Sequence, residues 1–226
     1  SSIEDLGIIE VLCKDKTGTL TENRMVVKEI WGEKDQVLGW AGKVVYENGH
    51  SKIDPFDEAI LNSLGSKHVQ VEVLAEVPFD PLRRRNTRMI KEKDGYVLVT
   101  RGAPETVLDL CELKDRSRVE EWMVEQGRKG QRVWAVAIKK LPVTGYQLQD
   151  IEKKERGMEL VGLITFEDPI KKSSVVALRM AKKMGVMVVV LTGDGLEVAR
   201  SVGEQIGLVE NERQVMGADR WSKLSL

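Results

Sequence analysis

Few residues of the kinds that build disulfide-bonded or zinc-bound scaffolds occur in this sequence. Its 226 residues include only two cysteines, Cys13 and Cys111, which lie far apart and outside any CxxC or Cys/His pattern. The two histidines, His50 and His68, also lack the spacing of metal ligands. Neither a disulfide framework nor a zinc site is indicated, and a reducing cytosolic setting fits.

Long apolar runs and an excess of charge are absent as well. The longest apolar run, Val186–Leu191, is far shorter than the roughly 20 residues of a membrane-spanning helix, and the N-terminus has no signal-peptide pattern. We therefore expect the chain as given to be soluble. Lys and Arg total 35 against 36 for Asp and Glu, so nothing indicates nucleic-acid binding. The absence of Walker A and GxGxxG strings argues against P-loop NTPases and Rossmann dehydrogenases.

The two ends of the chain have the pattern of a parallel sheet. The apolar run Gly7–Cys13 predicts a buried strand with Asp15 at its tip, and Val186–Leu191 predicts a second strand that ends at the turn Thr192–Asp194. Helical periodicity precedes the second strand and returns over Val198–Ile206. Alternating strands and helices predict an α/β, doubly wound sheet, which binds ligands at the carboxyl ends of its strands.

The middle of the chain has a different pattern, that of an antiparallel α+β insert. It predicts strands at 26–31, 132–141 and 158–166, a hairpin at 89–100 around an Asp-Gly turn, and helices at 54–64, 103–111 and 119–128. We therefore divide the chain into a sheet domain formed by 1–24 and 168–226 and an inserted domain, 25–167.

The string Asp-Lys-Thr-Gly-Thr-Leu-Thr at Asp15–Thr21 carries the strongest chemical signal. A carboxylate at a strand tip can attack phosphorus, and the small residues after it let backbone N–H groups approach a phosphate. Lys16 adds a cation beside the developing charge. A solvated turn aspartate is the alternative, which a string of this length disfavours. The string resembles, without a mismatch, the phosphorylation motif of P-type ATPases, a branch of the haloacid dehalogenase-like fold.

This resemblance implies roles for residues at both ends of the chain. Asp15 would accept the phosphoryl group, and Mg²⁺ would bind between Asp15, the Thr17 backbone carbonyl and the γ-phosphate. Thr17 stands where related phosphatases have an acid/base aspartate, which should prolong the phosphoenzyme. The triplet Thr192, Gly193 and Asp194 would lie beside the phosphoryl group. Asp168 opens an Asp-Pro-Ile-Lys string that is similar to the family's Asp-Pro-Pro-Arg hinge, although a helix N-cap is an alternative.

Within the insert, four short strings resemble the family's nucleotide pocket: they begin at Asp54, Pro78, Arg101 and Gly130. Phe79 is the expected adenine platform, Arg84 and Arg132 are expected at the phosphates, and Asp57 is expected in a polar network. Arg101-Gly102-Ala103-Pro104-Glu105 is similar to the family's Lys-Gly-Ala-Pro-Glu, so we include Arg101 and Gly102. Glycine beside a cation would let adenine and ribose lie close to the backbone, and a strand-to-helix turn is the alternative for this string. The alternatives are a core phenylalanine, a solvated arginine run, an acidic first helical turn and an exposed strand-end arginine.

Taken together, the resemblance implies a haloacid dehalogenase-like doubly wound sheet, truncated here, with an inserted antiparallel nucleotide-binding domain. It implies an ATP-driven, Mg²⁺-dependent cation pump at the cytoplasmic face of a membrane, whose membrane and actuator domains are not in this sequence. The family's Gly-Asp-Gly-x-Asn-Asp segment does not occur before Leu226, so we expect ATP binding with little turnover. A phosphatase of the same superfamily and a non-catalytic nucleotide-binding module are the alternatives, and the transported ion is left open.

Overall fold

A computed structural model describes residues 9–45, 53–67, 71–142, 151–217 and Arg220. The chain divides into two compact units, which are described separately below. The first unit comprises Ser1–Arg24, Glu125–Gln131 and Asp168–Leu226, and the second comprises Met25–Val124 and Arg132–Glu167.

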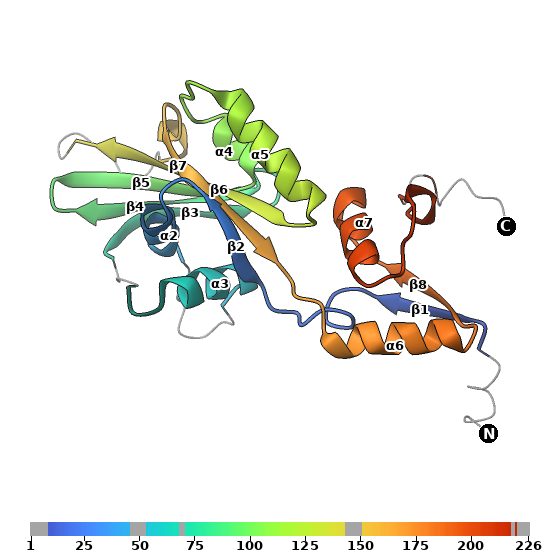
Figure 1. Cartoon of the computed structure of the whole chain (residues 1–226). Helices are drawn as coiled ribbons and strands as arrows, with labels where there is room; N and C mark the ends of the chain where they lie inside the picture. The colour runs from blue at the N-terminus through green and yellow to red at the C-terminus, as the bar shows by residue number, and fades with distance from the viewer. Residues whose placement is uncertain (1–8, 46–52, 68–70, 143–150, 218–219, 221–226) are drawn as a thin grey trace. The chain divides into compact units, whose positions relative to one another are not determined.

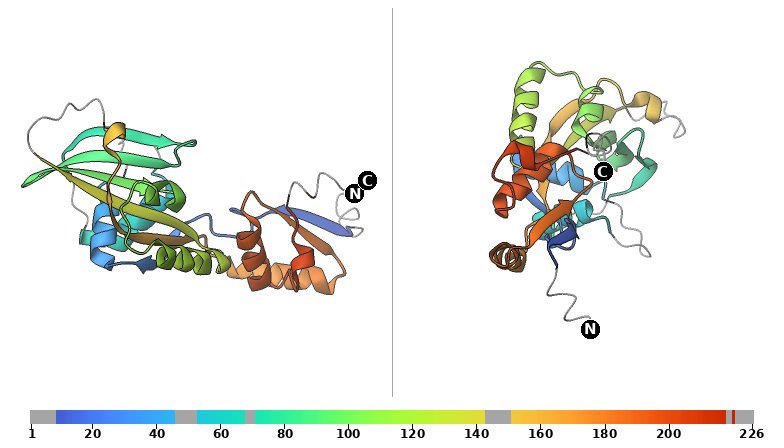
Figure 2. Two further views of the ribbon diagram at one scale, coloured as in Figure 1. Left: turned by 90° about the horizontal axis from the view of Figure 1, so that it is seen from above. Right: turned by 90° about the vertical axis from the view of Figure 1, so that its right-hand side faces the viewer.

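The second unit is built on a six-stranded antiparallel sheet with the strand order β2-β7-β6-β5-β4-β3. The strands are β2 (Val26–Trp31), β3 (Val73–Asp80), β4 (Arg85–Glu92), β5 (Gly95–Gly102), β6 (Arg132–Leu141) and β7 (Glu159–Glu167). The predicted β4–β5 hairpin is present, but Glu92 pairs with Gly95, so the two-residue turn is Lys93-Asp94 and Gly95 is the first residue of β5. The sheet twists along its length (Figure 2).

Helices cover both faces of this sheet (Figure 1). One face packs on α2 (Lys34–Gly42) and α3 (Pro55–Leu64), and the other packs on α4 (Pro104–Leu108) and α5 (Arg116–Arg128). Alternate residues of a strand point to opposite faces, so Val97 and Val99 of β5 enter the first core whereas Leu98 enters the second. A strand that is buried on both faces has an unbroken apolar pattern, as residues 96–99 of β5 do.

The start of α3 is fixed by local sequence. Asp54 is its N-cap, and its side chain accepts a hydrogen bond from the Phe56 N–H at 2.8 Å, while Pro55 occupies the first helical turn. This start directs Asp57, the third residue of the helix, toward the sheet, where it is buried. The predicted helix at 54–64 is therefore confirmed.

The first unit contains a two-stranded parallel sheet, β1 (Val11–Asp15) and β8 (Met187–Leu191). Helix α6 (Lys172–Lys183) precedes β8 and α7 (Leu196–Gln205) follows it. The small core of this unit contains Leu20, Leu178 and Ile206, packed on partly buried residues of β8. The parallel pairing agrees with the sequence pattern, but two strands are too few to show the wound sheet, which stays a prediction.

Several elements differ from the sequence-based expectation. Strand β1 begins at Val11 and includes Asp15, whereas Gly7 and Ile8 of the predicted strand lie outside the described residues. Helix α4 ends at Leu108, because Cys111 already forms a bridge with Met158. Strand β3 and helix α2 were not predicted. Within the described part of the chain, short 3₁₀ helices also occur at Gly65–Lys67, Glu152–Lys154 and Glu212–Gln214. Among the described residues, no helix has both the length and the apolar character needed to cross a membrane.

Candidate functional site

The parallel pairing of β1 with β8 brings two of the predicted strings together in the first unit. Asp15 pairs with Leu191, and the Lys16 N–H donates to the Leu191 carbonyl at 3.2 Å. The carboxyl ends of both strands therefore lie at one edge of the sheet, where open α/β sheets bind ligands. Asp15 is exposed at this edge, so its carboxylate is accessible to a substrate.

Lys16 and Asp194 form a buried ion pair across the two strand tips. Their side chains are only 5% and 6% exposed, and the Lys16 ammonium contacts the Asp194 carboxylate. A buried charge is tolerated only when it is balanced, so each side chain of the pair offsets the charge of the other. The Thr192 hydroxyl accepts from the Asp194 N–H at 3.1 Å, and a Cβ on Gly193 would meet nothing within 4 Å. The triplet thus forms a tight turn with open space at its glycine.

Asp168 lies in the same unit and binds the end of the Asp15–Thr21 string rather than the strand tips. It accepts hydrogen bonds from the Thr21 hydroxyl at 2.6 Å and from the Arg24 N–H at 3.2 Å. The N-cap of α6 is Lys171 rather than Asp168, so the N-cap alternative is wrong. The Lys171 ammonium donates to the Gly18 carbonyl at 2.6 Å. Sequence reasoning gave Lys171 no role, although the last position of Asp-Pro-Ile-Lys was the available signal.

The oxygen donors at the strand tips are compatible with magnesium. Among the described residues, no three His, Cys, Asp or Glu side chains gather into a metal site. The Asp15 carboxylate and the Thr17 backbone carbonyl are hard donors on exposed residues. Mg²⁺ commonly takes one or two carboxylates and completes its shell with water and substrate phosphates. This donor set therefore fits Mg²⁺ rather than a metal that requires an all-protein cage.

In the second unit, Asp57 of α3 and Arg101 of β5 form a buried ion pair, with side chains 5% and 4% exposed. Arg101 also donates to the Ala41 carbonyl at 3.2 Å and to the Asn86 side-chain oxygen at 3.4 Å. Burial lowers the pKa of the Arg101 guanidinium, although the Asp57 carboxylate opposes the shift. The structure thus joins these two predicted residues, and it commits the Arg101 side chain to protein contacts.

Arg101 and Arg132 flank a pair of stacked aromatic rings. Phe56 and Trp134 stack with ring centroids 4.6 Å apart and an interplanar angle of 22°. The Arg101 Cζ lies 5.3 Å from the Trp134 ring centroid, and the Arg132 Cζ lies 5.9 Å from that of Phe56. Both arginines are within cation–π range. The sequence analysis gave Phe56 and Trp134 no role. The available signal was their position, because Phe56 directly precedes Asp57 and Trp134 lies two residues after Arg132.

Phe79 and Arg84 lie at the β3–β4 turn and are both exposed. Phe79 is 59% exposed at the end of β3, so the alternative of a core phenylalanine is wrong. The Arg84 side chain is 55% exposed and forms an ion pair with Glu105 at the start of α4. An exposed aromatic ring next to an exposed cation can contact a planar, anionic ligand.

Gly102 is needed for a reason other than the one that the sequence suggested. The sequence argument was that glycine leaves room for a ligand. A Cβ at Gly102 would lie 2.4 Å from the Arg84 carbonyl oxygen and 2.5 Å from the Arg85 Cα, so the turn backbone occupies that space. The Ala103 N–H donates to the same Arg84 carbonyl at 2.9 Å. The glycine therefore lets β5 hold the turn that carries Phe79 and Arg84.

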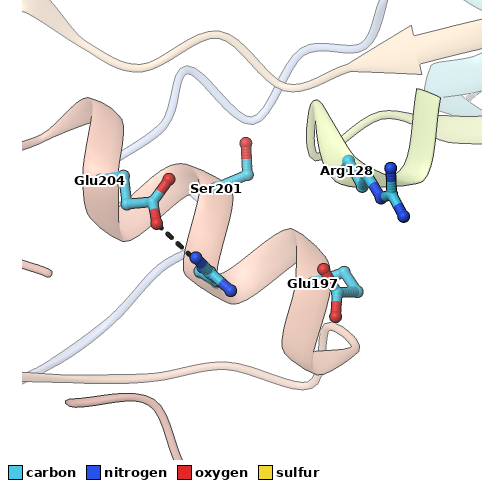
Figure 3. Close-up of a pocket in the computed structure, with 5 residues that line it drawn as sticks. Arg128, Glu197, Ser201 and Glu204 are labelled. Carbon is cyan, nitrogen blue, oxygen red and sulfur yellow. Dashed lines mark hydrogen bonds and ion pairs between the residues drawn. The ribbon is translucent and has the colours of Figure 1, made fainter. Parts of the chain in front are cut away.

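A pocket in the first unit is separate from these residues. It is lined by Arg128, Glu197, Arg200, Ser201 and Glu204 (Figure 3). Within α7, Arg200 donates to Glu204 at 2.9 Å. These two lining residues lie one helical turn apart and balance each other's charge. None of the predicted site residues lines it.

Two sites are thus defined: an exposed carboxylate at the tips of parallel strands, and a cationic, aromatic surface on an antiparallel sheet. The model of the family described as P-type ATPase, cytoplasmic domain N, matches residues 53–173. The chain therefore belongs to the P-type ATPase family, as its resemblance to that family predicts. The mixed α/β architecture with an antiparallel sheet agrees with this assignment.

Named relatives cover almost the whole chain. A magnesium-transporting ATPase, P-type 1, of Escherichia coli is 32% identical over 96% of this chain. A putative cation-transporting ATPase of Methanocaldococcus jannaschii is 29% identical over 92%, and a probable cation-transporting P-type ATPase of Mycoplasma pneumoniae is 25% identical over 97%. The match spans only 25–27% of the length of these relatives.

Proposed function

We propose that this chain binds ATP on its second unit and that Asp15 accepts the γ-phosphoryl group, which is the energy-coupling step of a cation-transporting ATPase. The observation that carries the proposal is the parallel β1–β8 pair, which sets Asp15 beside Thr192–Asp194 at one sheet edge. This pairing supports the proposal because it brings two distant strings, which would supply the nucleophile and the phosphate-binding donors, to the same sheet edge.

The nucleotide would lie against the exposed end of the antiparallel sheet. Phe79 supplies a flat ring for adenine, and Arg84 and Arg132 supply cations for the phosphates. Arg101 and Asp57, which are buried and paired, contribute by holding the wall of this surface. Gly102 contributes by allowing the turn of Phe79 and Arg84 to approach β5.

The chemistry proposed at Asp15 is a direct transfer. A carboxylate oxygen of Asp15 forms a bond to the γ-phosphorus, the bond to the bridging oxygen breaks, and ADP leaves with the bonding electrons. The Thr192 hydroxyl and the Gly193 N–H stabilise the phosphoryl oxygens, and Lys16, held by Asp194, adds positive charge. Asp15 and the Thr17 carbonyl would hold Mg²⁺, which would neutralise charge on the phosphates. Thr17 cannot activate water, which favours a long-lived aspartyl phosphate.

We further propose that this chain is part of a longer pump and that its first unit is completed by further elements. Large apolar side chains on β1, β8 and α6 are exposed, among them Val11, Met187, Leu191, Met180 and Met184. Large apolar side chains that stay exposed on neighbouring elements favour an interaction surface. The longer protein would include membrane and actuator domains and would lie with this part at the cytoplasmic face, and the isolated chain would turn over little ATP.

A titration of this chain with ATP, with and without Mg²⁺, tests the nucleotide site. We expect the amide chemical-shift changes caused by ATP to cluster near Phe79, Arg101 and Arg132. We expect Phe79→Ala to weaken ATP binding by about tenfold. The matched control is Val73→Ala, because Val73 is an exposed apolar residue at the other end of the same strand. The absence of shifts at millimolar ATP would refute ATP binding by this chain.

The phosphoryl-transfer step is tested in the full-length protein that contains this sequence. Incubation with ATP labelled at the γ-phosphate should give an acid-stable, hydroxylamine-sensitive phosphoprotein, as expected for an aspartyl phosphate. Asp15→Asn should abolish the label, whereas Asp109→Asn, at an exposed position of the second unit, should leave it unchanged. Labelling that persists in Asp15→Asn would refute the assignment, and rapid decay of the label would favour the phosphatase alternative.

A further inference from the structure

Three consecutive arginines lie where β4 begins: Arg83 and Arg84 are in the turn after β3, and Arg85 is the first residue of β4. Their side chains have different environments. The side chains of Arg83 and Arg85 are only 19% and 18% exposed, whereas that of Arg84 is 55% exposed. Arg83 and Arg85 both bind the carboxylate of Glu155, while Arg84 is directed to Glu105 instead. The arginine run is therefore not a uniformly solvated face.

Glu155 is almost fully buried, with a side chain 1% exposed, and both of its oxygens are used. Its Oε1 accepts from Arg83 and from the Thr87 hydroxyl, the latter at 2.7 Å. Its Oε2 accepts from Arg85 Nε at 3.0 Å and Arg85 Nη2 at 2.8 Å, which is a bidentate contact. Charge-assisted and bidentate bonds are the strongest hydrogen bonds in proteins and fix the geometry of their partners.

The charge of Glu155 also offsets the repulsion between the positive charges of this turn. Three adjacent guanidinium groups repel one another, and the repulsion grows where water is excluded. One buried carboxylate between Arg83 and Arg85 offsets this repulsion and holds both side chains on one side of the turn. The backbone is fixed independently by Asp80, whose side chain accepts from the Leu82 and Arg83 N–H groups at 2.6 and 3.1 Å.

We propose that Glu155 is a positioning residue for nucleotide binding: by holding Arg83 and Arg85, it leaves Arg84 as the single arginine of the run that is presented to the phosphates. This proposal rests on the proposed function, because it concerns the same turn. Glu155 comes from the segment before β7, about 70 residues away in sequence, and it touches no ligand itself. Without its charge, Arg83 and Arg85 would turn toward solvent and displace Arg84.

The test is a double-mutant cycle between Glu155→Gln and Arg84→Gln, measured as the dissociation constant for ATP in this chain. We expect Glu155→Gln alone to weaken ATP binding about fivefold, and to have less than about a twofold effect when Arg84→Gln is already present. A residue with a purely structural role would lower the melting temperature and change binding equally in both backgrounds. The control is Glu152→Gln, because Glu152 is an exposed partner of Arg83, and its effect should be below about twofold.

Equal ATP affinity of Glu155→Gln and the original chain, or an equal loss in both backgrounds, would overturn the positioning role. If Glu155→Gln does not fold, Arg83→Gln takes its place in the cycle, because it leaves the Arg85–Glu155 pair intact. A chain that does not bind ATP at all would refute the proposed function and this inference with it. ATP binding that is weakened by Phe79→Ala but not by either variant of the Arg83–Glu155 contact would refute the inference alone.

Discussion

The buried pair of Asp57 and Arg101 makes a prediction about stability that needs no ligand. Replacing Asp57 with Ala leaves a guanidinium that is 4% exposed without its carboxylate. Breaking a buried pair from one side costs about 3–5 kcal/mol. Arg101 keeps its contacts with Ala41 and Asn86, so we expect the lower end, about 3 kcal/mol. For a unit of this size, that loss lowers the melting temperature by roughly 6–12 °C.

Urea and thermal unfolding, followed by tryptophan fluorescence, measure this loss. A second variant, Asp57→Ala with Arg101→Met, removes both charges and should recover part of the stability, because no buried charge then lacks a partner. The matched control is Asp109→Ala, which removes an exposed partner of Arg116 and should cost less than about 1 kcal/mol. A loss below about 1 kcal/mol for Asp57→Ala, or a double variant less stable than Asp57→Ala, would refute the reasoning.

Two further predictions concern a glycine and a cysteine. Gly102→Ala should destabilise the second unit by about 2 kcal/mol in urea unfolding, because its Cβ would overlap the turn backbone; Gly39→Ala, whose Cβ meets nothing within 4 Å, should not destabilise it, and equal effects would contradict the steric argument. Burial raises the pKa of the Cys111 thiol from 9.0 to about 11. The free energy of unfolding that this thiol contributes is therefore fully present below pH 9 and is lost as the pH rises toward 11. Exposed Cys13 should therefore react with a disulfide reagent at pH 8 at least about tenfold faster than Cys111, and similar rates in the two single-cysteine variants would contradict this expectation.

Elements with a strong local signal could be predicted from the sequence. The Asp-Pro start of α3, the Asp-Gly hairpin between β4 and β5 and the apolar runs of β1 and β8 each have a physical cause within a few residues. Strand β3 was not predicted, because Val73–Asp80 lies at the sheet edge and mixes exposed and half-buried residues without a clean alternation. Helix α2 was missed for a similar reason, because its Gly39 and Gly42 weaken the helical pattern.

The contacts of the candidate sites were less predictable than their residues. The motif strings indicated Lys16 and Asp194 as site residues. Their ion pair depends on the register of β1 against β8, which the strings do not contain. No local pattern around Glu155 indicates that it binds arginines about 70 residues earlier, because such a contact depends on how the strands are ordered in the sheet. Sequence-based reasoning can therefore name chemical groups, whereas their pairing is a property of the folded chain.

The exposed fractions divide five of the six predicted nucleotide residues into two kinds with different expected phenotypes, and Arg132 is intermediate between them. Asp57, Arg101 and Gly102 are buried and hold the sheet end and its turn, so their substitution should lower stability and, through it, binding. Phe79 and Arg84 are exposed, so truncating their side chains creates no cavity in the core and leaves no buried charge without a partner. Variants at Phe79 and Arg84 should therefore weaken ATP binding at an unchanged melting temperature. That separation distinguishes a ligand-binding surface from a structural cluster, because a cluster that only stabilises the sheet would show loss of binding only together with loss of stability.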